Sequence, residues 1–257
     1  MPLIVFMKRF FIAAIAFFAA VCFFPAAGAH GILQPKPYLS PELVASSLAT
    51  LPAPPQPGTV EFLADEYGYF KAKLLRDTPR GAQAVADADM GPKVLLQFRE
   101  AFGYEITEES MPATYNLLMR AKECFGTYGC GEAKQHYRRT RPFVYYGTSS
   151  LTPWDDEWLK TNYSYPSGHS ANFYGLACIM IALNPERQNE IMQRAEEGAY
   201  SRVIVGAHWL SDTEAAKIVA LCVFARLQAD PEYLADFALA KKEIEAKQNA
   251  SKSQGKT

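Results

Sequence analysis

The stretch Ser164-Tyr165-Pro166-Ser167-Gly168-His169-Ser170 is followed at once by an almost uninterrupted apolar run, Phe173 to Leu183. A serine and a glycine stand where the helix carrying that run should begin. The free N–H groups of a helix N-terminus, together with the positive end of the helix dipole, bind anions. His169 would stand beside such an anion, where its ring can give or take a proton. Alone, the pattern also fits an ordinary helix start with a surface histidine.

Four cap residues followed directly by proline predict a chain built of helices. Proline is favoured at the first helical position because its missing N–H is not needed there. The pairs are Ser40-Pro41, Thr152-Pro153, Asn184-Pro185 and Asp230-Pro231. Apolar residues recur at helical spacing from 59 to 103, and no stretch alternates as a strand bounded by hairpin turns would. We therefore expect an all-α fold.

Two segments are apolar on every face, residues 173–183 and, apart from Arg226, residues 218–227. Both are shorter than the roughly 20 residues that cross a bilayer, so we expect them to be the central core helices of a single-domain bundle. The chain has 257 residues, 49% of them hydrophobic, which is enough for one sizeable core. The four prolines of residues 51–58 predict a stiff connection, and the polar tail from about 249 is expected to be disordered.

The first 29 residues have the composition of a cleaved export signal. Two basic residues at 8–9 precede an apolar run, 10–24, and Ala27-Gly28-Ala29 supplies small residues for cleavage. An uncleaved membrane anchor is the alternative, but the run is short for a bilayer span. Residues 30–257 would then form the mature domain in the periplasm, without a membrane segment. The net charge of −1 gives no reason to expect a nucleic-acid partner.

Signal removal leaves four of the five cysteines, an even number in an exported protein. Cys124 and Cys130 flank a segment with two glycines, which could break a helix and let the thiols form a disulfide. If the helix continues instead, thiols six residues apart point to different faces and cannot bond. Both outcomes stay open. Cys178 and Cys222 lie in apolar helical runs and are expected to be small buried hydrophobes.

A second cluster precedes the central one. Lys134 and Arg141 lie seven residues apart, about two turns along one helix face, and Pro142 would end that helix. A guanidinium can bind two phosphate oxygens at once, and an ammonium adds a point charge. A solvated basic face is the alternative, because Arg138 and Arg139, which we interpret as surface charges, lie in the same stretch.

A third cluster follows, with Ser201-Arg202, His208 and Asp212. Asp212 could accept the proton of one ring nitrogen of His208 and leave the other nitrogen free to attack. Two arginines, a lysine, a helix N-terminus and two histidines, one of them with a carboxylate partner, together predict phosphoryl transfer. We expect no metal site, because three cationic groups would repel a metal ion.

The three clusters match the signature of the type 2 phosphatidic acid phosphatase (PAP2) superfamily at all eleven fixed positions. These are Lys134-(six residues)-Arg141-Pro142, Pro166-Ser167-Gly168-His169, and Ser201-Arg202-(five residues)-His208-(three residues)-Asp212. Within the superfamily the chain resembles the bacterial class A non-specific acid phosphatases over most of its mature length. The proline-rich segment near residue 54 and the stretch from Asn184 to Glu190 carry this closer resemblance.

The resemblance implies an all-α periplasmic phosphomonoesterase of broad specificity that needs no metal or cofactor and acts through a phosphohistidine. It implies that His208 is the nucleophile, that His169 is the general acid and that Asp212 orients His208. The phosphate-binding residues that it implies are Lys134, Arg141, Ser167, Gly168 and Arg202. The implied partners are small-molecule phosphate monoesters, and a homodimer is compatible with it.

Two other functions stay open. The vanadium-dependent haloperoxidases are similar in all three clusters, although this chain is short for one. A periplasmic phosphate-binding protein without turnover would need neither the His–Asp pair nor the second histidine. A membrane lipid phosphatase is disfavoured, because no spanning helix is expected after signal removal.

Overall fold

The computed structural model describes residues 35–254. The predicted export signal, residues 1–29, lies outside these described residues. Residues 35–254 form helices and connections without any strand, so the predicted all-α fold is confirmed. The α-helices are α1 (Ser47–Thr50), α2 (Val60–Lys73), α3 (Pro79–Ala86), α4 (Arg99–Phe102), α5 (Pro112–Glu123), α6 (Cys130–Tyr137), α7 (Pro142–Tyr145), α8 (Asp156–Thr161), α9 (Gly168–Leu183), α10 (Gln188–Val205), α11 (Leu210–Leu227) and α12 (Pro231–Gln254). Over the same range, no helix combines the length and the apolar character that a membrane span requires.

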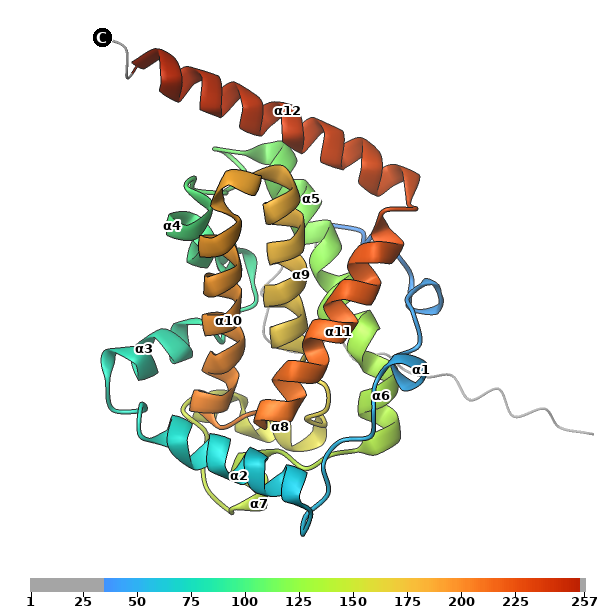
Figure 1. The fold of residues 1–257 in the computed structure, drawn as a ribbon, viewed down its shortest axis with the longest axis vertical. Coiled ribbons are helices and arrows are strands. Elements are labelled where there is room, and N and C mark those ends of the chain that lie inside the picture. Colours follow the sequence, from blue (N-terminus) through green and yellow to red (C-terminus); the bar gives the residue numbers. More distant parts are fainter. Residues whose placement is uncertain (1–34, 255–257) are drawn as a thin grey trace, which may run out of the picture. The chain divides into compact units, whose positions relative to one another are not determined.

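Helix α9 is the centre of the bundle. It packs between α10 and α11, with α5 beside it, and every residue from 170 to 177 is buried (Figure 1). The all-round apolar run therefore does form the expected central helix. The second apolar run, in α11, keeps one face in solvent, where Ile218 is 39% and Leu221 58% exposed. Both runs therefore form core helices, but α11 differs from α9 because only one side of it is buried against α9.

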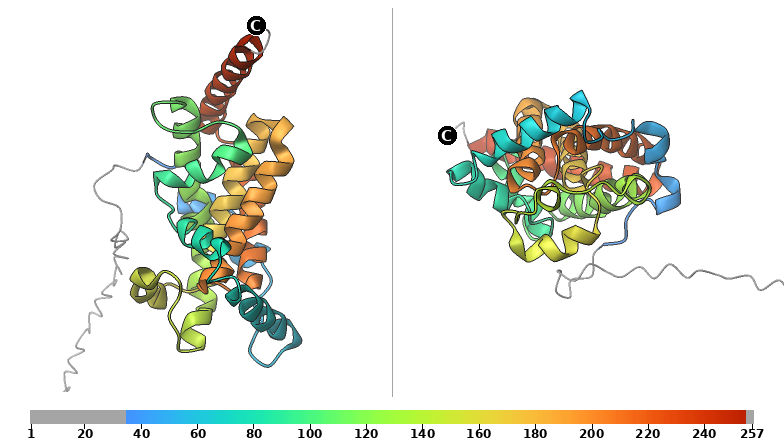
Figure 2. Two further views of the ribbon diagram at one scale, coloured as in Figure 1. Left: turned by 90° about the vertical axis from the view of Figure 1, so that its left-hand side faces the viewer. Right: turned by 90° about the horizontal axis from the view of Figure 1, so that it is seen from below.

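The two ends of the bundle differ. Helix α12 packs on α5 and crosses one end, whereas α2, α7 and α8 gather at the other end, where α9 begins (Figures 1 and 2). Each predicted proline start is confirmed: 3₁₀ turns begin at Pro41, Pro153 and Pro185, and α12 begins at Pro231. The tail expected to be disordered from residue 249 is helical as far as Gln254, because an established helix adds further residues at little cost.

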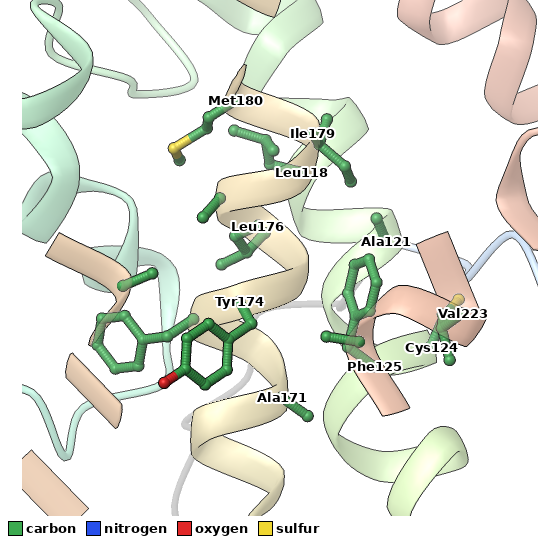
Figure 3. Packing of buried hydrophobic residues seen from close by; sticks show 14 of the residues in the cluster. Leu118, Ala121, Cys124, Phe125, Ala171, Tyr174, Leu176, Ile179, Met180 and Val223 are labelled. Atoms are coloured by element: carbon green, nitrogen blue, oxygen red, sulfur yellow. The ribbon is translucent and has the colours of Figure 1, made fainter. Parts of the chain in front are cut away.

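The segment between Cys124 and Cys130 is a π-helical insertion, η4 (Cys124–Gly129), which joins α5 to α6 without a break. The two thiols are free and donate to carbonyls of their own helix, so the disulfide left open by the sequence is not formed. The glycines serve helix packing instead: a Cβ added to Gly126 would lie 2.8 Å from the Gly168 carbonyl oxygen. Figure 3 shows Phe125 of this segment, and Ala121 of α5, in the core beside α9.

Candidate active site

Lys134 and Arg141 approach one point from two different segments. Helix α6 ends at Tyr137, because Arg138 takes a left-handed conformation with φ of 47°, and the chain then runs without helix to α7. The expectation that both residues lie on one helix face was therefore wrong. Their side chains still converge on the Tyr163 carbonyl, which accepts from Lys134 Nζ at 2.6 Å and from Arg141 Nη2 at 3.2 Å.

Arg141 is 3% exposed, and its guanidinium is held mainly by main-chain carbonyls. Besides the Tyr163 carbonyl, its acceptors are the carbonyls of Leu159 (3.0 Å), Asn162 (2.6 Å) and Ala207 (2.9 Å). Its Nη1 also lies 2.9 Å from Nε2 of His208. Burial, and next the charge of Arg202, lower the pKa of Arg141 to about 9. Burial, and next Arg141, lower the pKa of Lys134 to about 7.

His208 is bonded at both ring nitrogens. Its Nδ1 lies 3.3 Å from Asp212 Oδ2, and the Trp209 N–H donates to the same oxygen at 2.9 Å. Because a carboxylate only accepts, Nδ1 carries the hydrogen and Nε2 keeps its lone pair, which Arg141 Nη1 contacts. Burial, and next Arg141, hold the pKa of His208 well below its usual value. The ring is therefore neutral and has its free lone pair on Nε2.

Local helix geometry explains this pairing. Asp212 lies in the first turn of α11 and caps that helix by accepting the Trp209 N–H. At the other end of the connection, Gly206 has φ of 88°, and the Arg202 carbonyl accepts the N–H of His208 at 3.2 Å. His208 therefore lies just before α11 and Asp212 lies in its first turn, and the four-residue spacing lets the two side chains meet.

Arg202 carries the free donors of the site. It is 1% exposed, and its Nε and Nη1 have no hydrogen-bond partner within residues 35–254. A buried donor without an acceptor is costly, and a guanidinium fits two oxygens of a phosphate at once. Burial lowers the pKa of Arg202 to about 10, so it keeps its charge at neutral pH. The described structure therefore offers an anion two buried cationic N–H groups.

The start of α9 is fixed by the residues that the central motif supplies. Ser167 caps the helix, its Oγ accepting from the N–H of Ser170 at 3.2 Å, and its own N–H donates to the Asp212 carbonyl at 3.0 Å. A Cβ on Gly168 would lie 2.9 Å from the Gly126 carbonyl oxygen, so only glycine allows this close approach. The N–H groups of Gly168 and His169 occupy first-turn positions, which have no acceptor in their own helix.

His169 is held differently from His208. Its Nε2 lies 3.1 Å from the carbonyl oxygen of Ala88, which can only accept, so Nε2 carries the hydrogen and Nδ1 is the proton-exchanging atom. Burial, and next the charge of Arg202, hold the pKa of His169 well below its usual value. The neighbouring Asp87 is buried and accepts from Ser201 Oγ at 2.5 Å and from Arg194. Ser201 thus fixes the segment that holds His169.

The prediction that Arg139 is a surface charge was wrong. Arg139 is buried, with Nη1 2.5 Å from Asp212 Oδ1 and Nη2 2.6 Å from Asp65 Oδ2. Asp65, Asp87 and Arg139 were all missed, because their partners are distant in the sequence and no local pattern marks them. Arg138 is exposed, as expected.

No His, Cys, Asp and Glu side chains gather in a metal-ligand group anywhere in residues 35–254.

The family model of the PAP2 superfamily matches residues 114–233. The non-specific acid phosphatase of Providencia stuartii is 43% identical to this chain over 80% of it and 84% of that protein. The corresponding enzyme of Salmonella typhi is 37% identical over 83% and 86%, and the acid phosphatase of Zymomonas mobilis is 34% identical over 77% and 75%. The chain therefore belongs to the PAP2 superfamily and, within it, to the non-specific acid phosphatases.

Proposed function

We propose that this protein hydrolyses a broad range of phosphate monoesters through a covalent phosphohistidine at His208. The observation that carries the proposal is an asymmetry between the two histidines of the site. His208 has a carboxylate on Nδ1, which leaves the Nε2 lone pair for attack, whereas His169 has only a carbonyl partner. The unpartnered donors of Arg202 supply the place for the phosphoryl oxygens.

Substrate binding begins with charge. Two phosphoryl oxygens accept from Arg202 Nε and Nη1, and the N–H groups of Gly168 and His169 add donors at the helix start. An anionic oxygen is also a stronger acceptor for Arg141 Nη1 than the neutral Nε2 of His208. The guanidinium therefore turns to the phosphate and frees the His208 lone pair. Broad specificity follows, because every assigned contact is to the phosphoryl group.

In the first step, Nε2 of His208 forms a bond to phosphorus as the ester P–O bond breaks. The leaving oxygen takes the proton from Nδ1 of His169, which the bound dianion has made basic enough to be protonated. Asp212 stabilises the positive charge that develops on His208. In the second step, Nδ1 of His169 takes a proton from water, the water oxygen attacks phosphorus, and the P–N bond breaks to release phosphate.

Rapid quenching of the enzyme with a ³²P-labelled aryl phosphate tests this sequence of steps. The expected product is acid-labile, alkali-stable label on the peptide that contains His208, with full activity after dialysis against a chelator. Vanadate should inhibit, because it mimics five-coordinate phosphorus. Label at another residue would overturn the nucleophile assignment. A loss of activity on chelation that a divalent ion restores would overturn the metal-free mechanism.

We also propose that the protein works in the periplasm after cleavage following Ala29. The basic pair at 8–9, the apolar run and the small residues before position 30 support this proposal. N-terminal sequencing of the active enzyme released by osmotic shock should begin at His30. An intact N-terminus in the membrane fraction would instead indicate an uncleaved anchor.

A further inference from the structure

We propose that Arg139, balanced by Asp65, is a positioning residue that holds the Asp212 carboxylate in the orientation His208 requires. The inference rests on the proposed function, because it assigns Arg139 a part in forming the phosphohistidine. It arises from two charged side chains behind the catalytic pair, Arg139 and Asp65, which no part of the sequence signature contains.

The guanidinium of Arg139 lies between two buried carboxylates, and its four terminal N–H groups are all used. Nη1 donates to Asp212 Oδ1 at 2.5 Å and to Ser211 Oγ at 2.8 Å. Nη2 donates to Asp65 Oδ2 at 2.6 Å and to the Pro55 carbonyl at 3.2 Å. Asp212 is 0% and Asp65 2% exposed, so water cannot replace either contact. The group is therefore fixed in one orientation.

This arrangement divides the two oxygens of Asp212 between two tasks. Oδ1 accepts from Arg139, whereas Oδ2 accepts from the Trp209 N–H and faces Nδ1 of His208. Without Arg139, Oδ1 would be a buried anionic oxygen with no partner, and the carboxylate would rotate or take up a proton. Either change removes the acceptor for the Nδ1 hydrogen. The hydrogen would then move to Nε2, the atom that must attack.

Asp65 sets the charge of the group. Arg139 and Asp212 alone would be neutral overall and would draw the carboxylate charge away from His208. With Asp65 the three side chains carry a net charge of −1, which stabilises the positive His208 ring once phosphorus is bound. Asp65 also accepts from the N–H and the Oγ of Ser211, at 2.8 and 2.6 Å, and so ties α2 to the first turn of α11.

The competing explanation is that the three charged side chains only stabilise the fold. The net free energy that such a group contributes to folding is expected to be small. Burying three ions costs desolvation that their attraction only partly repays, and apolar residues often replace such groups without loss of stability. The chain contains a second, less buried arginine between two carboxylates far from the site: Arg120 lies between Glu232 at 2.6 Å and Asp236 at 2.8 Å, and the Glu232 side chain is 60% exposed. It joins α5 to α12 at the opposite end of the bundle (Figure 1).

The test compares Arg139→Met, Arg139→Lys and Asp65→Asn with Arg120→Met in the full-length enzyme. Arg139→Met should lower kcat by roughly 10- to 100-fold, the effect of one lost charge-assisted hydrogen bond, with KM and the inhibition constant of phosphate little changed. Arg139→Lys, which keeps the charge, should recover part of kcat. Asp65→Asn, an isosteric change that should fold even if Arg139→Met does not, should lose kcat several-fold. Arg120→Met should keep kcat whatever stability it loses.

Two readouts would not move if the role were only structural. One is the fall of kcat at an unchanged KM, and the other is the partial recovery of kcat in Arg139→Lys. Rapid-quench labelling of His208 separates the two proposals. Unlabelled wild-type enzyme would overturn the proposed function. Wild-type labelling rates in Arg139→Met and Asp65→Asn would overturn this inference alone.

Discussion

The two histidines of the site are held by opposite kinds of partner. His208 faces a carboxylate, with two more charged side chains behind it, whereas His169 faces the uncharged carbonyl of Ala88. Burial lowers the pKa of both rings, so burial does not account for the difference between them. The nucleophile must carry a positive charge while phosphorus is bound, and a fixed negative charge stabilises that state. A general acid must release its proton in one step and recover it in the next. A fixed negative charge would hold that proton back.

The largest expected effect separates these two roles directly. His208→Ala should reduce the hydrolysis of every phosphate ester to background, because no nucleophile remains. His169→Ala should lose roughly 10²–10⁴-fold on alkyl and nucleoside phosphates, but much less on nitrophenyl phosphate, whose leaving group is stable without a proton.

Stopped-flow measurement of nitrophenol release gives the control. His169→Ala should still show a burst, since only the second step then lacks its base, and His208→Ala should show none. A burst in His208→Ala would reverse the two assignments, and the carboxylate would then mark the acid rather than the nucleophile.

Arg202 binds the phosphoryl group, on which both histidines act. Its removal should therefore slow the hydrolysis of alkyl and aryl esters to the same extent. Arg202→Ala deletes two buried donors and should lower kcat/KM by about 10²–10³-fold for alkyl and aryl esters alike. Arg138→Ala, which removes an exposed guanidinium at the end of α6, should stay within a factor of two. A leaving-group dependence in Arg202→Ala would place Arg202 with His169 alone.

Local patterns in the sequence predicted the pair of His208 and Asp212, but they did not predict the partners of Arg139 and Ser201. His208 and Asp212 are four residues apart, and the start of a helix joins them, so their pairing is a local property. The partners of Arg139 and Ser201 lie far away in the sequence, on α2 and after α3, and only the fold brings them together. The same reasoning explains the helices: periodicity and caps identified them, but nothing local revealed the left-handed turn at Arg138 that turns Arg139 inward.

Lys134 provides a pH-dependent test of the anion site itself. Its pKa is lowered to about 7 by burial, then by Arg141, whereas a bound dianion favours the charged form. Sulfate, whose charge is constant from pH 5.5 to 9, should therefore bind more weakly as the pH rises above about 7. The inhibition constant of sulfate should rise by up to about tenfold per pH unit there, and Lys134→Met should flatten that slope by up to one proton. An unchanged slope would place Lys134 outside the site.

Ser201→Ala tests the uncharged support of His169. Losing its hydrogen bond to Asp87 should loosen the segment that carries the Ala88 carbonyl and lower kcat about 3- to 10-fold, more for alkyl than for aryl esters. Thr114→Ala is the matched control, because it also removes a buried hydroxyl bound to a carboxylate, that of Glu243 at 2.6 Å. Thr114→Ala should cost stability but leave the ratio of the two activities unchanged. An equal loss on both ester classes in Ser201→Ala would show that Ser201 does not act through His169.

The smallest expected effect concerns the contact below the start of α9. Gly126→Ala would place a Cβ 2.7 Å from the Asn172 amide and 2.8 Å from the Gly168 carbonyl oxygen, so α9 must shift away from η4. Overpacking of this kind costs about 1–3 kcal/mol in the free energy of unfolding. Gly131→Ala, one turn further along the same continuous helix, meets nothing within 4 Å and should gain about 0.5–1 kcal/mol, because alanine is the better helix former. Chemical denaturation measures both changes. Since Gly168 and His169 begin α9, Gly126→Ala should also weaken phosphate binding, whereas Gly131→Ala should not. If both variants were equally stable and bound phosphate equally well, the glycine–glycine contact would not be what positions the start of α9.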